Sequence, residues 1–276
     1  MAVLIFAVVV GVTAGSRVGD ARSSNSAPGA PGSEAVWTEA DKDGFGTSTT
    51  TGSKVWYTID DGRMTEVYYP DLGTPSVRDM QFIVSDGKTF AELETEATTH
   101  EVELVDEKAL VYRQINTDKF GDYRITKTYV TDPDRATVLV DVDFESLSGK
   151  PYQVYALYDP ALDNGGNDDS GAVRGPALVA NDDGVASALV ASPEFGKRST
   201  GYKDTSDGWQ DLKTDFKMDW NYRSSSDGNV VQTARLQVDG VDNQDATLSL
   251  GFAGTIDGAI QGAQASLATG FEQAQT

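Results

Sequence analysis

Apolar and polar residues alternate with a period of two through most of residues 54–159, in short runs separated by turn residues. Such alternation is typical of β-strands, because successive side chains of a strand point to opposite faces of the sheet. The runs cover residues 77–85, 89–95, 100–105, 109–116, 122–130, 136–144 and 152–158. Short turns such as Asp86-Gly87 and Ser148-Gly149 join them, so this stretch is predicted to be an antiparallel meander.

The densest strand signal lies at residues 55–69, where two aromatic and β-branched runs flank Asp61-Gly62. Residues of these types favour strands, and an Asp-Gly pair suits the positive φ angles of a tight hairpin turn. Pro70 and Pro75 follow. Because proline lacks the backbone N–H that a sheet uses, they should end the hairpin.

Later runs predict strands at residues 177–180, 185–191, 230–238 and 247–252, the first two forming a hairpin about Asp183-Gly184. Between residues 54 and 159 no segment with helical periodicity is long enough for the crossover that a parallel sheet needs. One open sheet of so many strands would leave an apolar face in water. The predicted fold class is therefore all-β, a large antiparallel two-sheet β-sandwich with one or two short helices.

Two segments carry helical periodicity. Ser206 is a candidate N-cap for a short helix whose apolar residues lie near one face: Trp209, Leu212, Phe216 and Trp220. The Ala/Gln-rich tail repeats the pattern with Ile260, Ala263, Leu267 and Phe271. Glycines interrupt this second helix and its apolar stripe is sparse, so we expect residues 256–275 to be poorly ordered without a partner.

The charge balance is strongly acidic, with 43 Asp and Glu against 22 Lys and Arg and a net charge of -21. Nucleic acids and anionic membranes would repel such a chain, which argues against both as partners, whereas a neutral glucan would not be repelled. The chain contains no cysteine, which excludes disulfides, thiolate metal sites and a cysteine nucleophile.

One loop concentrates hard oxygen donors of the kind that calcium prefers. The candidate ligands are Asp159, Asp163, Asn164, Asn167, Asp168 and Asp169. Their spacing is not that of an EF-hand, and a solvated acidic loop is the alternative interpretation. No other cofactor is expected.

The sequence does not select catalytic residues. His100 is the only histidine, and no motif of the nucleophile-elbow type accompanies it, so we expect an exposed strand residue. Several aromatic residues could stack on sugars or pack in the interior: Trp37, Trp56, Trp209, Trp220, Tyr57, Tyr68 and Tyr69. Packing is the usual role of aromatic residues in a large sandwich.

Three segments also resemble one known family. The hairpin VWYTIDDGRMTEVYYPDLGTP at residues 55–75, the run VRDMQFIVSDGKTF at 77–90 and the segment SDGWQDLKTDFKMDW at 206–220 are similar to the N-terminal β-domain of bacterial and archaeal glucoamylases and glucodextranases, glycoside hydrolase family 15. A weaker match lies in KDGFGT at residues 42–47. The resemblance covers most of the chain from about Ala35 onward.

The resemblance implies a β-supersandwich that precedes a six-hairpin helical toroid, and this toroid carries both catalytic glutamates. Those glutamates would lie outside the chain. The expected function is a non-catalytic structural and interface domain of a secreted, inverting, exo-acting α-glucan hydrolase that releases glucose from non-reducing ends. The expected partners are the toroid of the same polypeptide and, through it, an α-glucan. The alternatives are an independent glucan-binding module and an adhesive surface protein.

The expected organisation has four parts. The apolar run of residues 2–12 is followed by Val12-Thr13-Ala14, which has the small-residue spacing of a signal peptidase site, so residues 1–14 are read as a signal peptide. Residues 15–34, rich in Ser, Pro, Gly and Ala, would be a flexible leader. Residues 35–255 would form the supersandwich, and residues 256–276 a linker helix toward the catalytic domain.

Overall fold

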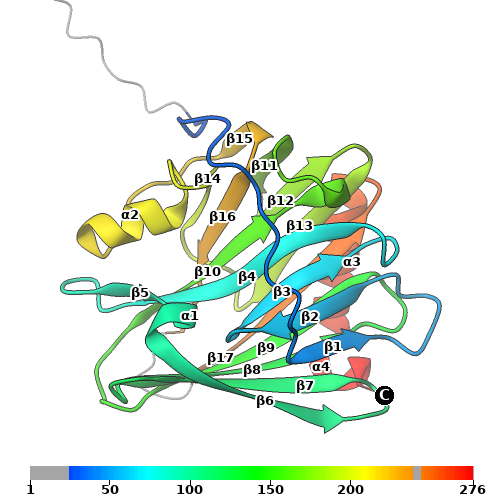
Figure 1. The fold of residues 1–276 in the computed structure, drawn as a ribbon, viewed down its shortest axis with the longest axis horizontal. Coiled ribbons are helices and arrows are strands. Elements are labelled where there is room, and N and C mark those ends of the chain that lie inside the picture. The colour runs from blue at the N-terminus through cyan, green and yellow to red at the C-terminus, as the bar shows by residue number, and fades with distance from the viewer. Residues whose placement is uncertain (1–24, 239–243, 276) are drawn as a thin grey trace, which may run out of the picture.

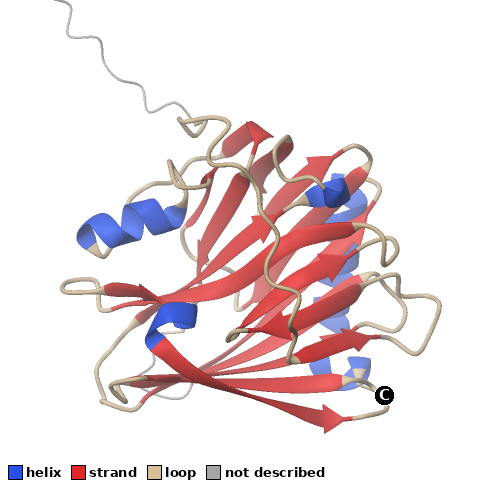
Figure 2. Ribbon diagram, viewed as in Figure 1, coloured by secondary structure: helices blue, strands red, loops and turns tan. Residues whose placement is uncertain are grey.

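The computed structural model describes residues 25–238 and 244–275. The predicted signal peptide and the first part of the predicted leader lie outside these residues. Within the described part, the strands form two large sheets that face each other (Figures 1 and 2), and no helix is long and apolar enough to cross a membrane. The predicted all-β, two-sheet sandwich is confirmed.

Neighbouring strands of the eight-stranded sheet are antiparallel. Its order is β1 (Gly44–Thr47), β2 (Trp56–Asp60), β3 (Arg63–Tyr68), β4 (Pro75–Ser85), β10 (Gln153–Pro160), β16 (Val230–Arg235) and β14 (Arg198–Tyr202), with β5 (Ala91–Leu93) paired to β4. The turn between β2 and β3 is the predicted one, because Asp61 and Gly62 both have positive φ, 49° and 76°.

The nine-stranded sheet is also antiparallel. Its order is β15 (Ser224–Gly228), β11 (Asp169–Arg174), β12 (Ala177–Asp182), β13 (Val185–Ser192), β17 (Gln244–Ala253), β9 (Thr137–Ser146), β8 (Tyr123–Thr131), β7 (Val111–Asp118) and β6 (Thr98–Asp106). The predicted meander is therefore correct in two blocks, β2 to β5 in the eight-stranded sheet and β6 to β9 in this one. Strand β10 leaves it to pair with β4 and β16 in the other sheet, and β9 pairs instead with the distant β17.

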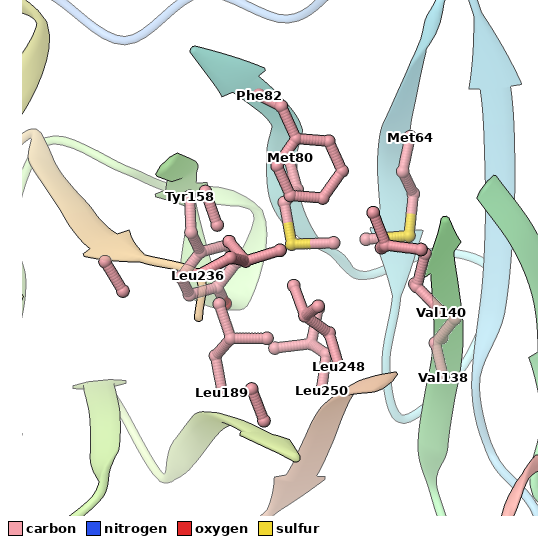
Figure 3. Close-up of a cluster of buried hydrophobic side chains, with 14 of the residues drawn as sticks. Met64, Met80, Phe82, Val138, Val140, Tyr158, Leu189, Leu236, Leu248 and Leu250 are labelled. Carbon is pink, nitrogen blue, oxygen red and sulfur yellow. The ribbon is translucent and has the colours of Figure 1, made fainter. Parts of the chain in front are cut away.

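The main core lies between the two sheets (Figure 3). The eight-stranded sheet contributes side chains that are at most 3% exposed: Met64, Met80, Phe82 and Tyr158. The facing sheet contributes Val138, Val140, Leu189, Leu248 and Leu250, all 0% exposed. Full burial of one such side chain stabilises the fold by about 1.5–3 kcal/mol, so this layer dominates stability.

The first predicted helix forms as α2 (Gly208–Asp215), which packs on the outer face of the eight-stranded sheet through Leu212. It is shorter than predicted, because Phe216 takes a left-handed φ of 69° and Trp220 lies beyond the helix. Its N-cap is Asp207 rather than the predicted Ser206. The Asp207 carboxylate accepts hydrogen bonds from the backbone N–H groups of Trp209 and Gln210, whereas the Ser206 hydroxyl accepts one from Tyr202 N–H. A carboxylate at this position satisfies two free N–H groups of the first turn.

The expectation of a poorly ordered tail is wrong. Helix α3 (Ile256–Thr269) packs on the outer face of the nine-stranded sheet, with Ala259 and Ala263 fully buried, and α4 (Phe271–Ala274) follows it. A Cβ atom on Gly251 of β17 would lie 2.8 Å from Ala263 N, so the helix lies against the strand backbone. Small residues on both surfaces thus replace the large apolar stripe that the prediction required.

Residues 25–43 form a strap across the outer face of the eight-stranded sheet (Figure 1). Its first part bonds to other segments of the same chain: Ala27 N–H donates to Ser224 O of β15 (2.8 Å), and Ser33 N–H donates to Lys203 O just after β14 (3.1 Å). Farther along, Arg78 Nε donates to Val36 O at 2.7 Å. The prediction of a flexible leader is therefore wrong for residues 25–34, because backbone hydrogen bonds take the place of apolar burial.

Candidate functional site

The six predicted calcium ligands do not meet in the structure. Asp159 at the end of β10 is buried and paired with Lys203 (Nζ–Oδ2 3.0 Å) and Arg78 (Nη1–Oδ2 3.8 Å) beneath the strap. Burial raises the pKa of Asp159 to about 6, although the charges of Lys203 and Arg78 oppose the rise. Its carboxylate already has two cationic partners.

Asp169, at the start of β11, is fully buried in a different environment. Both of its carboxylate oxygens lie 3.3 Å from Leu162 N–H, in the short helix η1 (Leu162–Asn164). Burial raises the pKa of Asp169 to about 8, and the charges of Asp182, Asp159 and Asp168 add to the rise. A carboxyl group with this pKa is largely protonated at neutral pH.

The other candidates lie nearer the surface. Asn167 accepts a hydrogen bond from Ala35 N–H of the strap (2.9 Å), and Asp163, Asn164 and Asp168 are exposed. Among the described residues, no group of three or more His, Asp or Glu side chains is placed to hold a metal ion. The calcium site stays a prediction, and the exposed Asp163 and Asp168 are the carboxylates left to serve it.

Calcium at millimolar concentration, on this hypothesis, will raise the melting temperature of the chain, since a ligand that binds only the folded state stabilises it. The measurement is a thermal melt with calcium and with chelator. Asp168→Asn should abolish the shift, whereas Asp215→Asn, an exposed carboxylate on α2, should preserve it. Equal melting temperatures in calcium and in chelator would show that the loop binds no calcium and is simply a solvated acidic loop.

Of the seven candidate aromatic residues, only Tyr57 lies fully in the interior, and the other six are half-buried or exposed. Tyr57 is fully buried, stacks on Tyr129 with ring centroids 5.7 Å apart and donates a hydrogen bond to Leu110 O. Tyr69 stacks on Phe252 at 5.5 Å. Both stacks stabilise the sandwich, and the buried Tyr57 offers no face to a sugar.

Trp37 and Tyr68 are different, because they line an open hollow of about 360 Å³ beside the strap. Trp37 is 39% exposed. Glu66 at the floor accepts hydrogen bonds from Lys42 Nζ (2.8 Å) and Thr38 N–H (3.1 Å), which outweigh burial and lower its pKa. An exposed indole beside fixed polar groups is a combination that can stack on and hydrogen-bond a sugar ring.

His100 lines a second, acidic hollow of about 500 Å³, together with Glu39, Asp41, Asp43, Asp60, Asp61 and Arg63. The histidine lies in β6, as predicted, but its side chain is only 29% exposed rather than open to solvent. Its Nε2 is 3.6 Å from Asp61 Oδ1. The hollow contains no serine or cysteine nucleophile, so the residues that line it do not form a hydrolase triad.

Beneath this hollow lies a buried ion pair that the sequence reasoning missed. Lys127 Nζ is 2.8 Å from Glu94 Oε1 and donates to Gly62 O at 2.7 Å, and both side chains are at most 1% exposed. Glu94 belongs to the short helix α1 (Glu94–Ala97). The available signal was the position of Lys127 in its strand. It lies on the same face as the apolar residues Tyr123, Ile125 and Tyr129, and it therefore points inward.

Comparison with known proteins identifies the fold. A family described as "Glucodextranase, domain N" matches residues 27–276. The glucoamylase of Clostridium sp. (strain G0005) is 36% identical over 253 residues, which are 90% of this chain and 36% of the glucoamylase. A crystal structure of a bacterial glucoamylase complexed with acarbose superposes with a TM-score of 0.84 at 36% identity, covering 88% of this chain and 36% of that one.

The chain thus spans about a third of the length of the glucoamylases that it matches. The resemblance drawn from residues 55–90 and 206–220 is confirmed, and it extends across nearly the whole sandwich. The chain belongs to the family of glucodextranase N domains.

Proposed function

We propose that this chain is the non-catalytic N-terminal domain of a secreted, inverting, exo-acting α-glucan hydrolase, and that it supports a catalytic helical toroid in the same polypeptide. The observation that carries the proposal is the superposition on only 36% of a glucoamylase chain at a TM-score of 0.84. The remaining part of such a relative is long enough to contain a catalytic domain. The apolar run at residues 2–12 supports export.

The chain alone should release no glucose from maltooligosaccharides or dextran, because the proposal places the catalytic acid and base outside it. A chimera in which this chain replaces the matched part of the Clostridium glucoamylase should release glucose. Glucose release by the purified chain, after rigorous removal of host glucosidases, would contradict the proposal. So would a folded chimera that has no activity although the parent glucoamylase is active.

The hollow beside Trp37 and Tyr68 favours a second candidate function, an independent glucan-binding module. The discriminating measurement is retention of the chain on an insoluble α-glucan column. Retention that Trp37→Ala abolishes, with Trp209→Ala as the control for loss of an aromatic residue elsewhere, would support this alternative. Trp209 is a suitable control because it packs against the cluster beneath α2.

A further inference from the structure

A groove of about 630 Å³ lies on the outer face of the nine-stranded sheet, across strands β6 to β9. In β8 the inward positions are apolar apart from Lys127, and the outward positions that line the groove are Arg124, Thr126 and Thr128. We call this surface the β6–β9 groove. Threonine and charged residues that are half-buried on a sheet face, with no element packed over them, indicate a surface that can accept a partner.

One carboxylate of this groove, Asp143, has a buried oxygen, Oδ1, without a hydrogen-bond donor among the described residues. Burial raises the pKa of Asp143 and of Asp141. Asp141 accepts one hydrogen bond, from Thr247 Oγ1 at 3.0 Å. A buried acceptor without a donor costs free energy, which a partner carrying N–H or O–H groups would recover.

The last described helix reaches this groove. Ala274 of α4 packs against Val111, Val130 and Leu139, which are outward-facing residues of β7, β8 and β9. Two positions farther along the same strands, the outward residues are groove residues: Arg113, Thr128 and Asp141. Figure 1 places the C-terminus beside the ends of β6 and β7.

Exposed apolar side chains lie at both ends of these strands. Leu104 and Val105 of β6 are 40% and 43% exposed near the α4 end. At the opposite end, Phe120 in the β7–β8 turn is 92% exposed and Leu147 after β9 is 38% exposed. Exposed large apolar side chains that border one surface mark it as a candidate interaction site.

We infer that the β6–β9 groove is the docking surface for the catalytic part of the same polypeptide, an inference that rests on the proposed function. About two thirds of each matched glucoamylase lies outside the part that this chain covers. Ala274 of α4 packs on Val111, Val130 and Leu139, which adjoin the groove, so a polypeptide that continues beyond α4 starts beside it. The docked surface presents hydrogen-bond donors to Asp141 and Asp143 and apolar groups to Phe120.

The test uses the absence of cysteine from this chain. Thr126→Cys places one thiol in the groove, and Thr214→Cys, at an exposed position of α2, is the matched control. Maleimide labelling of each thiol, located by peptide mass spectrometry, is compared between the isolated chain and the Clostridium chimera. We expect labelling of the Thr126→Cys variant to slow at least tenfold in the chimera, and labelling of the Thr214→Cys variant to stay within twofold.

Equal labelling of the Thr126→Cys variant in the isolated chain and in an active chimera overturns the groove assignment and leaves the proposed function intact. A folded but inactive chimera, with an active parent glucoamylase, overturns both. If labelling of the isolated chain slows at high protein concentration, the groove binds a second copy of the chain. If it slows on addition of maltooligosaccharide, the groove binds a glucan. Either result overturns the inference. Thr117→Cys on β7 replaces Thr126→Cys if the latter does not fold.

Discussion

Lys127→Ala and Glu94→Ala will each lower the free energy of unfolding by about 3–5 kcal/mol, because either change leaves one charge buried without its counterion. The pair is fully enclosed between the sheets. Burial raises the pKa of Glu94 and lowers that of Lys127, and the charge of each opposes the shift of the other. The Glu94 carboxylate also accepts hydrogen bonds from Phe82 N–H (2.8 Å) and Asn116 Nδ2 (2.7 Å).

Urea denaturation of the two single variants and of Glu94→Gln/Lys127→Met provides the measurement. The double variant should lose clearly less stability than the sum of the single variants, since it carries no unpaired charge. Lys150→Ala is the matched control: Lys150 lies 3.7 Å from Asp122 and is 65% exposed, so its loss should cost at most about 1 kcal/mol. Additive losses, or single losses as small as that of the control, would show that the buried pair does not act as a unit.

Stability will fall as the pH rises from about 4 to 8, and Asp169→Asn will reduce the fall. The pKa of Asp169 rises from an ordinary 3.8 to about 8 in the folded chain. The folded state therefore binds this proton more tightly than the unfolded state does. The resulting stability is fully present below pH 3.8 and is lost as the pH rises through 8. The loss amounts to about 6 kcal/mol at most.

Denaturation curves between pH 4.5 and 8.5 test this expectation. Asp159, whose pKa rises to about 6, acts with the same sign below that pH, so the slope between pH 6 and 8 reports mainly on Asp169. The exposed neighbour Asp168→Asn is the control for the loss of one negative charge. If Asp168→Asn and Asp169→Asn change the slope above pH 6 equally, the buried carboxyl is not the source.

Local chemistry was enough to predict much of the fold. The hairpin about Asp61-Gly62 and that about Asp183-Gly184 both form, because turn residues and flanking alternation specify the same structure. Helix α2, predicted from its apolar face and its N-cap signal, forms for the same reason. Residues 169–174 carry none of the strand runs predicted above, yet they form β11, whose Gly171 allows the close approach of Val230 and Thr200.

Long-range contacts were the part that the sequence could not supply. Glu94 was assigned to a strand, and only α1 turns its carboxylate toward Lys127 in the opposite sheet. Ala259 and Ala263 are weakly apolar, and their burial depends on Gly251, which belongs to another element. Asp159, one of the candidate calcium ligands, is paired with Lys203, a residue 44 positions away, which no local pattern reveals.

The pairing of β9 with β17 has a consequence for the order of folding. The partners Thr137 and Gly251, like Phe144 and Gln244, are separated by a hundred residues or more. During synthesis, β6 to β9 can therefore assemble as a local meander long before the strand that completes their sheet leaves the ribosome. Until then β9 presents an unpaired edge to solvent. Closure of such distant pairs is slow, so a nascent chain of this domain is most exposed to aggregation before β17 has been made.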